Sequence, residues 1–405
     1  MIRHVLRLIW NRKRTNLLMM AEIFVAFLVL FAVTALAVYT ADLWRQPIGF
    51  TPDRIWSVAI DMKQTTNDSY LPAQQETVRQ VLLALEDFPE IEQSAGTELA
   101  PYHLGASEDS YVWRGRRIEH GSAEVTDDFN ELMGLTLVEG RWFGPEDRGQ
   151  NYDPVVINYP MRADLFGNGP VLGENLSPQR APDDAAPPPP KRVVGVVGAY
   201  REDGEFDGMK HYVIFRKDLA GTGLRDRPPR NVLIKVQPGT TAEFEERLLG
   251  RLQAVAPEWS FEVTPMAEMR ESRMRLAMVP LLVVALVAGF LMLMVALGVF
   301  GVLWQNVTQR FREIGLRRAK GAARVHIRRQ ILGEIAVMTS LALLAGALLV
   351  IQFPLLNVIY FVEPHVYVLG LVISAAIMYL LTLACAWYPS RLATRIEPAE
   401  ALRYE

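Results

Sequence analysis

The chain has 405 residues, of which 50% are hydrophobic, and its formal net charge is −3. This composition is too apolar for an ordinary soluble enzyme and too polar for a protein made only of membrane helices, so it predicts membrane spans joined to a sizeable water-soluble part. The only cysteine, Cys385, stands in an apolar run near the C-terminus. No internal disulfide can form, and apolar surroundings favour a packing role over a nucleophilic role for this thiol.

Four uncharged stretches are long enough to cross a bilayer, whose hydrocarbon core of about 30 Å needs about 20 helical residues. They run over Ile23–Ala41, Leu276–Trp304, Ile335–Val362 and Val366–Tyr388. With their flanks we assign transmembrane helices to residues 17–41, 276–304, 331–362 and 366–388. We interpret the first as an uncleaved anchor because its apolar run is longer than a signal-peptide core. Pro354 predicts an end or a break in the third.

Basic residues set the orientation of these spans. They precede the first span, fill the loop 305–330 between the second and third, and recur in the tail 389–405, whereas the link between the third and fourth has none. The segment Ala41–Arg275 instead holds 38 acidic and 26 basic residues. We therefore expect an inner-membrane protein with both termini in the cytoplasm and a large periplasmic domain over 42–275. An amphipathic helix on the inner membrane surface is expected over 1–16.

The second span is longer than a bilayer requires. Its 29 residues would form a helix of about 43 Å at 1.5 Å per residue. We expect part of it to project beyond the membrane, and tilting within the bilayer is the alternative.

The segment 42–275 shows two βαβ patterns, one at each end. The first is strand Arg54–Met62, helix Gln74–Leu85 and strand Ile91–Leu99; the second is strand Asn231–Val236, helix Thr241–Val255 and strand Ser260–Val263. Their apolar spacings predict a split ferredoxin-like lobe over 42–99 plus 231–275. The fold class is therefore a four-helix membrane protein with an α+β extracytoplasmic domain.

Residues 100–230 then form an inserted, mainly-β lobe. We expect a helix near Met161–Phe166 and a strand over Arg192–Val197 in it. The proline-rich stretch Ala181–Lys191 (APDDAAPPPPK) predicts a solvated loop.

The sequence has no pattern of a catalytic site. It lacks G-x-x-x-x-G-K-[ST], H-E-x-x-H, C-x-x-C and G-x-S-x-G. We expect no catalytic residue, bound cofactor or metal. A ligand pair of His103 and His120 is the weaker alternative, and Asp127 with Asp128 is interpreted as a solvated face. Glu22 and Glu334 stand near the cytoplasmic ends of their spans. Interfacial water or a neighbouring arginine can offset the free-energy cost of a carboxylate there.

The loop after the second span is strongly basic and reads NVTQRFREIGLRRAKGAARVHIRR over residues 306–329. Such a charge density can bind nucleic acid, but a short loop held at a membrane suits anionic headgroups or an acidic protein surface better. Gly321 and the alanines after it predict a helix break, so we expect a compact docking knob and no nucleic-acid partner.

The wording of this loop, FREIGLRRAKGA, resembles the signature of the FtsX/MacB-type permeases of ABC transporters. The tail YPSRLATRIEPAEALRYE is similar to the family's C-terminal pattern. In the outer segment, VTDDFNELMGLTLVEGRWF, PVVINYPMRADLFG and KRVVGVVGAYRE resemble the family's periplasmic core in wording and order. The resemblance covers nearly the whole chain. The proline-rich stretch departs from the pattern.

The resemblance implies a non-catalytic subunit that pairs with a second permease, identical or paralogous, above a separate cytoplasmic ABC ATPase dimer. ATP and Mg would be bound by that ATPase and not by this chain. The residues implied to contact it are Arg312, Glu313, Ile314, Gly315, Leu316, Arg317, Arg318 and Gly321. Small residues at Gly298, Gly301, Ala342 and Gly346 suit a close dimer seam, or equally packing within one subunit.

The family's known roles leave two functions open. The first is mechanotransmission that couples ATP hydrolysis to periplasmic work, with efflux, lipoprotein extraction or lipid extraction as the task and an adaptor or lipoprotein as partner. The alternative is an FtsX-like regulator that switches a periplasmic cell-wall hydrolase. A membrane sensor is disfavoured because no kinase or cyclase motif is present.

Overall fold

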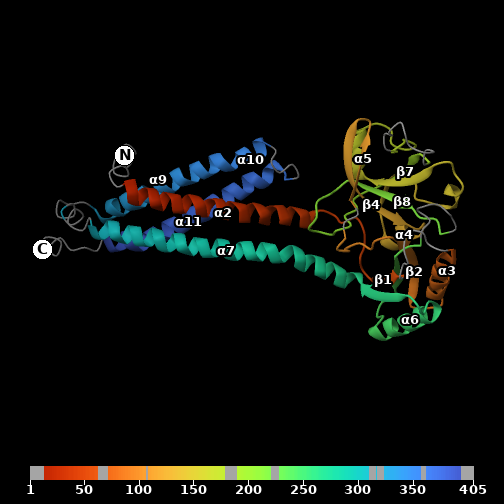
Figure 1. Ribbon diagram of the computed structural model, residues 1–405. Coiled ribbons are helices and arrows are strands. Elements are labelled where there is room, and N and C mark those ends of the chain that lie inside the picture. The colour runs from red at the N-terminus through yellow and green to blue at the C-terminus, as the bar shows by residue number, and fades with distance from the viewer. Residues whose placement is uncertain are drawn as a thin grey trace. The chain divides into compact units, whose positions relative to one another are not determined.

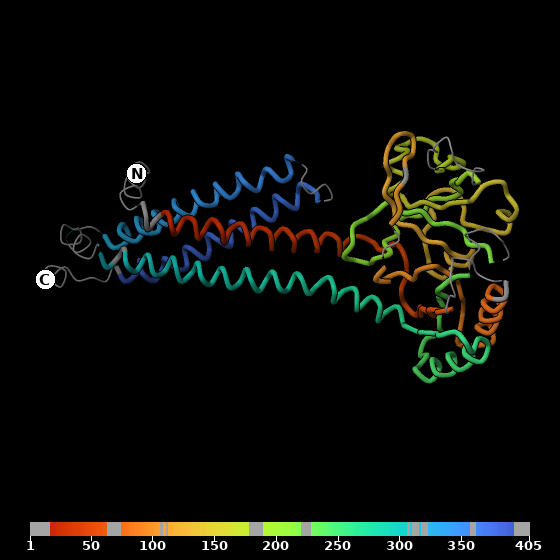
Figure 2. Tube along the Cα trace, in the orientation of Figure 1, coloured from red at the N-terminus to blue at the C-terminus, as the bar shows by residue number. Residues whose placement is uncertain are grey.

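A computed structural model describes residues 13–62, 72–105, 108–177, 189–219, 228–309, 316, 323–356 and 362–393. The chain divides into two compact units. The helical unit comprises Met1–Asp42 and Met278–Glu405, and the α/β unit comprises Leu43–Ala277. Figure 1 labels the elements, and Figure 2 follows the same chain as a tube.

Four of the described helices are long and apolar enough to cross a membrane. They are α2 (Lys13–Arg45), α7 (Met266–Gln309), α9 (Arg324–Val350) and α11 (Pro364–Ala393), with a short α10 (Gln352–Leu355) after α9. The four predicted membrane helices are thereby confirmed. In the helical unit α9 and α11 pack along each other (Figure 1).

The helical unit has its own apolar core. Phe27 of α2, Val299 of α7, Met338 of α9 and Met378 of α11 are buried in one cluster. The outward faces of the same helices carry exposed leucine and valine, for example Leu286, which is 70% exposed. An apolar surface of this kind suits lipid better than water.

Three of the membrane helices, α2, α7 and α11, are longer than the uncharged runs that predicted them. α7 has 44 residues, about 66 Å at 1.5 Å per residue, and it begins at Met266, ten positions before the predicted Leu276. Hydropathy marks only the part of a helix that suits hydrocarbon, whereas flanking Arg, Glu and Met continue the helix into the charged region. The helix thus continues beyond the uncharged run on its N-terminal side, and its projection beyond the membrane stays a prediction.

Two predicted boundaries were wrong because charged residues continue a helix beyond its apolar part. Residues 13–16 belong to α2 and not to a separate surface helix, and residues 324–330 belong to α9 and not to the loop. In the third span α9 stops at Val350 and the separate helix α10 contains Pro354, in agreement with the end or break expected at this proline. Residues 357–361, before the predicted end of this span, lie outside the described residues. The remainder of the expected surface helix, residues 1–12, and the tail from residue 394 lie outside the described residues.

The described strands of the α/β unit form one ten-stranded sheet in the order β10-β1-β9-β2-β4-β8-β6-β7-β5, with β3 beside β4. The strands are β1 (Ile55–Asp61), β2 (Ile91–Thr97), β3 (Glu108–Trp113), β4 (Arg116–Val125), β5 (Leu137–Gly140), β6 (Asp153–Asn158), β7 (Lys191–Val197), β8 (Tyr212–Arg216), β9 (Asn231–Val236) and β10 (Ser260–Pro265). The helices are α3 (Pro72–Glu86), α4 (Phe129–Met133), α5 (Tyr159–Phe166) and α6 (Ala242–Val255), with a 3₁₀ turn η1 (Pro145–Asp147).

The two terminal βαβ patterns meet as the sequence predicts. β9 lies between β1 and β2 and is antiparallel to both, and β10 is antiparallel to β1. α3 and α6 lie side by side over this part of the sheet (Figure 1). Their apolar residues Val81 and Leu248 share a buried cluster with Val58 and Ile234 of the strands, which is the arrangement of a split ferredoxin-like lobe.

The inserted segment continues this sheet. β4 joins β2 at Thr97 and Val125, and β8 then pairs with β4 in parallel. Beyond it, β6 is antiparallel to β8 and parallel to β7. The sequence indicated a mainly-β insertion but not its continuity with the first lobe. Most of the proline-rich stretch, residues 178–188, lies outside the described residues, and its last residue, Lys191, begins β7.

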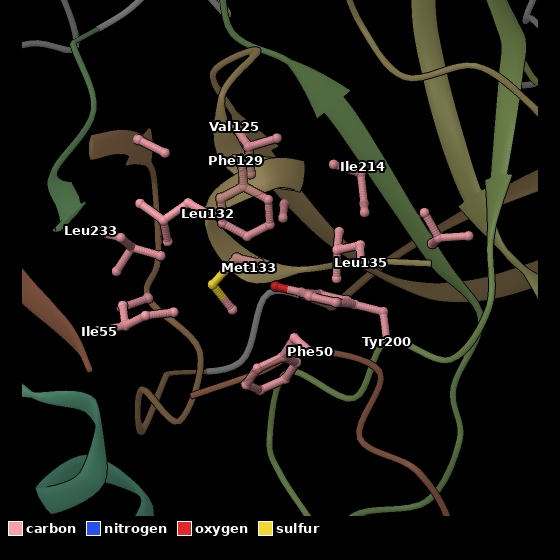
Figure 3. Packing of buried hydrophobic residues seen from close by; sticks show 14 of the residues in the cluster. Phe50, Ile55, Val125, Phe129, Leu132, Met133, Leu135, Tyr200, Ile214 and Leu233 are labelled. Carbon is pink, nitrogen blue, oxygen red and sulfur yellow. The ribbon is translucent and has the colours of Figure 1, made fainter. Parts of the chain in front are cut away.

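An aromatic cluster fills the face of the sheet opposite to α3 and α6. Figure 3 shows Phe50, Phe129 and Tyr200 gathered around Met133. The ring centroids of Phe50 and Tyr200 are 5.8 Å apart. The chain after α2, helix α4 and the loop after β7 are therefore fixed together in one apolar core, where close packing resists displacement of any one of them.

Candidate functional site

The predicted ATPase-contacting loop is only partly described. Leu316 is helical and 50% exposed. The remaining predicted contact residues, Arg312, Glu313, Ile314, Gly315, Arg317, Arg318 and Gly321, lie outside the described residues. Their role therefore stays a prediction.

One contact between helices lies close to the end of this loop. α7 ends at Gln309 and α9 begins at Arg324. The guanidinium carbon of Arg328 lies 4.6 Å from the centroid of the Trp387 ring on α11, a cation–π contact that holds the start of α9. The loop is thus bounded by helices that contact their neighbours.

The small residues predicted for a dimer seam occupy different environments. Ala342 is buried in the helical core. A Cβ built on Gly346 would lie 2.5 Å from the Phe27 ring, and one built on Gly298 would lie 2.4 Å from the Glu22 carboxylate. Three of the four thus have contacts within the subunit, and whether any of them also lies at a dimer seam stays a prediction. Gly301 is exposed with open space beside it, and its role at a dimer seam remains a prediction.

The same contacts locate the two carboxylates near the loop end of their helices. Glu22 lies against Gly298 of α7. The Glu334 carboxylate accepts a hydrogen bond of 3.2 Å from the Gln330 amide one turn earlier on α9. Both carboxylates therefore contact other residues of the helical unit.

The loop between β7 and β8 carries a charged cluster that sequence reasoning missed. Arg201 is 3% exposed, and its guanidinium donates to the backbone carbonyls of Leu43 and Gln46 at 3.0 Å each. It also donates to the carbonyls of Glu205 and Asp207 within its own loop. A buried guanidinium is stable only when such acceptors surround it. Arg201 therefore fixes the last turn of α2 and the residue that follows this helix to the loop.

The first turns of α7 are held by the same loop. Arg270 Nε lies 2.6 Å from Glu205 Oε1, and Arg273 Nη2 lies 2.5 Å from Asp203 Oδ1. Arg273 also donates to the carbonyls of Tyr102 and His103. The segment Tyr200–His211 thus binds both the chain after α2 and the beginning of α7, and we name it the clasp loop.

One clasp-loop carboxyl has an unusual proton affinity. Burial raises the pKa of Glu202 to about 7, although the Tyr212 hydroxyl, which donates to this carboxylate, lowers it. Nearby Asp203 raises it further, while Lys210 and Arg273 lower it. A carboxyl with this pKa exchanges its proton near neutral pH.

The weak histidine-pair hypothesis finds no support in the contacts of its members. His103 Nδ1 accepts a hydrogen bond from the Gly105 amide, and His120 is buried in β4 with Nδ1 2.9 Å from the Gly121 carbonyl. Asp127, one of the two aspartates predicted to form a solvated face, accepts two hydrogen bonds from the Arg216 guanidinium. Within the described ranges no group of three or more His, Cys, Asp or Glu side chains could hold a metal ion.

The clasp loop is only weakly indicated by the sequence. Its start lies at the end of KRVVGVVGAYRE, one of the stretches that resemble the family. A charged run after an apolar strand is also typical of an ordinary surface loop. Only the fold shows that Arg201 turns inward to backbone acceptors more than 150 residues earlier in the chain.

Four helices long and apolar enough to cross a membrane, together with an α/β unit, define a membrane protein with a folded domain outside the lipid. Residues 23–250 match the family model described as MacB-like periplasmic core domain, and residues 285–398 match the one described as FtsX-like permease C-terminal. The first match covers more than half of the chain. The chain therefore belongs to the MacB/FtsX family of ABC transporter permeases.

Curated relatives agree with this family. The chain is 25% identical over 302 residues to the uncharacterized ABC transporter permease YvrN of Bacillus subtilis, covering 69% of each chain. It is 26% identical over 287 residues to the pyoverdine export ATP-binding/permease protein PvdT of Pseudomonas aeruginosa, covering 68% of this chain and 41% of PvdT. With the macrolide export ATP-binding/permease protein MacB of Escherichia coli K12 it shares 25% over 296 residues, covering 69% of this chain and 43% of MacB.

The chain thus spans about two thirds of YvrN and less than half of PvdT and MacB. Among solved structures, the periplasmic region of MacB from Actinobacillus actinomycetemcomitans is 13% identical with a TM-score of 0.36, covering 57% of this chain and 97% of that region.

Proposed function

We propose that this chain is the non-catalytic permease subunit of a MacB/FtsX-type ABC transporter, and that it transmits ATP-driven motion from a separate cytoplasmic ATPase to the α/β unit. The observation that carries the proposal is the continuity of α7. This single helix runs from Met266, which is buried in the aromatic core of the α/β unit, to Gln309 at the basic loop. A displacement at one end of a helix reaches the other end if the helix moves as a body.

The clasp loop supports this role. A helix conveys motion to a domain only when it is fixed to that domain, and the pairs Arg270–Glu205 and Arg273–Asp203 fix the first turns of α7. The aromatic core around Met133 then joins the clasp loop to helix α4 and to the sheet. Motion of α7 would therefore rotate the α/β unit as a body.

The topology in this proposal follows the basic residues. The loop 305–330 and both termini would face the cytoplasm, and the acidic segment would lie in the periplasm. Two permease subunits would stand above the ATPase dimer, which would bind ATP and Mg, because this sequence lacks a phosphate loop. The work performed would be efflux or the extraction of lipoprotein or lipid.

The test is affinity purification of the tagged chain in mild detergent followed by mass spectrometry of the bound proteins. We expect an ATPase near one-to-one with the permease. The variants Gly315→Arg and Glu313→Gln of the permease should no longer stimulate ATP hydrolysis by the ATPase. The variant Glu258→Gln, at an exposed position in the turn between α6 and β10, should still stimulate it. Absence of any ATPase, or normal stimulation of the two loop variants, would contradict the proposal. A cell-wall hydrolase as the next most abundant protein would favour the regulatory role instead of export.

A further inference from the structure

The clasp loop forms one wall of a cavity in the α/β unit. The cavity measures about 380 Å³ and opens to solvent. Its ionic wall consists of Asp203, Glu205, Asp207, Lys210 and Arg273. This volume lies within the range of about 300–1,000 Å³ that is typical of sites for small ligands.

The charged side chains of this wall are held in place and remain accessible. Lys210 Nζ lies 2.8 Å from Asp207 Oδ2 and 3.4 Å from Asp203 Oδ2, and Arg273 pairs with Asp203. The side chain of Lys210 is 42% exposed and that of Asp207 is 35% exposed. Lys210 Nζ also lies 2.8 Å from Glu108 Oε1. Because cations and carboxylates already stand side by side, a ligand that carries both a cation and an anion can exchange partners with them.

Apolar residues also line the cavity. They are Leu276 of α7, which is 58% exposed, Leu104 of the loop before β3, which is 69% exposed, and Phe206 of the clasp loop. The Trp44 ring contacts the Phe206 ring in a tilted arrangement, with the ring centroids 5.4 Å apart. Exposed leucines beside a tryptophan are typical of the interface between headgroups and hydrocarbon.

The position of the cavity along α7 agrees with that interface. Arg270, Arg273 and Arg275 end the charged part of the helix, and the uncharged run starts at Leu276. The cavity is lined by residues from both sides of this change, Arg273 and Ala277 among them. Hydrocarbon suits the helix only from Leu276 onward, so a membrane boundary at this residue would place the ionic wall at headgroup level.

We propose that this cavity binds the headgroup of a zwitterionic phospholipid that carries a primary ammonium and a phosphate. The phosphate would lie against Lys210 and Arg273, and the ammonium would donate to Asp203 and Asp207, with the acyl chains along Leu276 and Leu104. The lining has three carboxylates and two cations, so a purely anionic headgroup meets an additional repulsion. A quaternary ammonium lacks the N–H donors that carboxylates accept. The site is independent of any coupling to an ATPase.

The test is native mass spectrometry of the full chain in detergent, titrated with dioleoyl phosphatidylethanolamine, phosphatidylcholine or phosphatidylglycerol. We expect one tightly bound phosphatidylethanolamine and roughly tenfold weaker binding of the other two lipids. Lys210→Gln and Asp207→Asn should each weaken phosphatidylethanolamine binding by about tenfold. The control variant Arg247→Gln on α6 breaks the ion pair of Arg247 with Glu90. It should bind phosphatidylethanolamine as tightly as the wild type does.

A further variant tests the site without changing the charged residues, whose replacement could disturb the fold of the clasp loop. Ala277→Trp fills the cavity from the α7 side without changing its charge, and it should lose the bound lipid while the thermal transition of the protein stays unchanged. Equal binding of the three lipids, or lipid retention by Lys210→Gln and Ala277→Trp, would overturn the proposal.

Discussion

Arg273 of α7 and Asp203 of the clasp loop form an ion pair with 2.5 Å between Nη2 and Oδ1, and the side chains are only 20% and 25% exposed. Two residues further along the same helix, Arg275 pairs with Glu271 of α7 itself. The two arginines therefore carry the same charge and lie on the same helix, but their ion-pair partners belong to different segments. One joins α7 to the α/β unit, and the other joins α7 only to itself.

This difference gives a matched pair of variants for coupling. We expect Arg273→Ala to reduce export-coupled ATP hydrolysis several-fold, because α7 would then move without the clasp loop. Arg275→Ala should leave it near the wild-type rate. The measurement is ATPase activity of the reconstituted complex with and without its export partner proteins. Equal effects of the two variants would show that the Asp203 pair has no special role.

Replacing Arg201 should weaken the whole α/β unit. Arg201→Met removes the donor of several buried carbonyl acceptors, and unsatisfied buried groups cost about 1–3 kcal/mol each. We expect a total loss near 3 kcal/mol because some carbonyls will find water. Thermal unfolding of the full chain in detergent measures it. Arg247→Met at an exposed pair serves as the control and should change the transition little.

Glu202 should make stability depend on pH. Its pKa is about 7 in the folded protein, against an ordinary 4.5. Between these values the folded state holds a proton that the unfolded state releases, so this contribution is full below about pH 4.5 and is lost as the pH rises through 7. The slope is at most about 1.4 kcal/mol per pH unit.

Glu202→Gln removes this titration and provides the comparison. His120 and His211 have pKa values lowered by burial and give a pH dependence of the opposite sign, but they are present in both proteins. The difference in transition temperature between wild type and Glu202→Gln should therefore change steadily from pH 5 to pH 8. A difference that is constant over this range would refute the assignment.

Variants at two glycines of the helical unit distinguish packing within one subunit from contact with a second subunit. Gly346→Leu would place a side chain against Phe27 and should destabilise the helical unit by about 1–3 kcal/mol, the usual cost of overpacking. Gly301→Leu meets open space and should leave monomer stability unchanged. If Gly301 lies at a dimer seam, the same variant will lower the dimer fraction in size-exclusion light scattering. An unchanged dimer fraction would remove Gly301 from the seam.

Several features of the fold were predictable because they follow from local patterns. The uncharged runs identify the membrane helices, and the apolar spacings in Gln74–Leu85 and Thr241–Val255 identify the helices α3 and α6. Helix ends were less predictable, because Met266–Arg275 is charged yet still helical. Hydropathy reports solvent preference and not the conformation of the backbone.

The clasp loop could not be predicted, since its bonds join residues that are distant in the sequence. Arg201 bonds to Leu43, and Arg273 pairs with Asp203. Neither partner is indicated by spacing or composition. Likewise, the continuity of the sheet rests on one register, Thr97 opposite Val125, which no strand pattern specifies.

The central claim is that α7 conveys motion from the basic loop to the α/β unit. Its most direct test measures the distance between two spin labels on the α/β units of a permease dimer, with ATP and without it. The chain suits this test because Cys385 is its only cysteine. Cys385→Ser with Glu243→Cys, an exposed position on α6, places one label on each subunit.

Two insertions after Ala277 then separate helix continuity from helix length. Four alanines lengthen α7 but keep it helical, whereas four glycines interrupt it. We predict an ATP-dependent change of the label distance in the wild type and in the alanine insertion, and its loss in the glycine insertion while ATP hydrolysis continues. An unchanged ATP response in the glycine insertion would contradict transmission through α7.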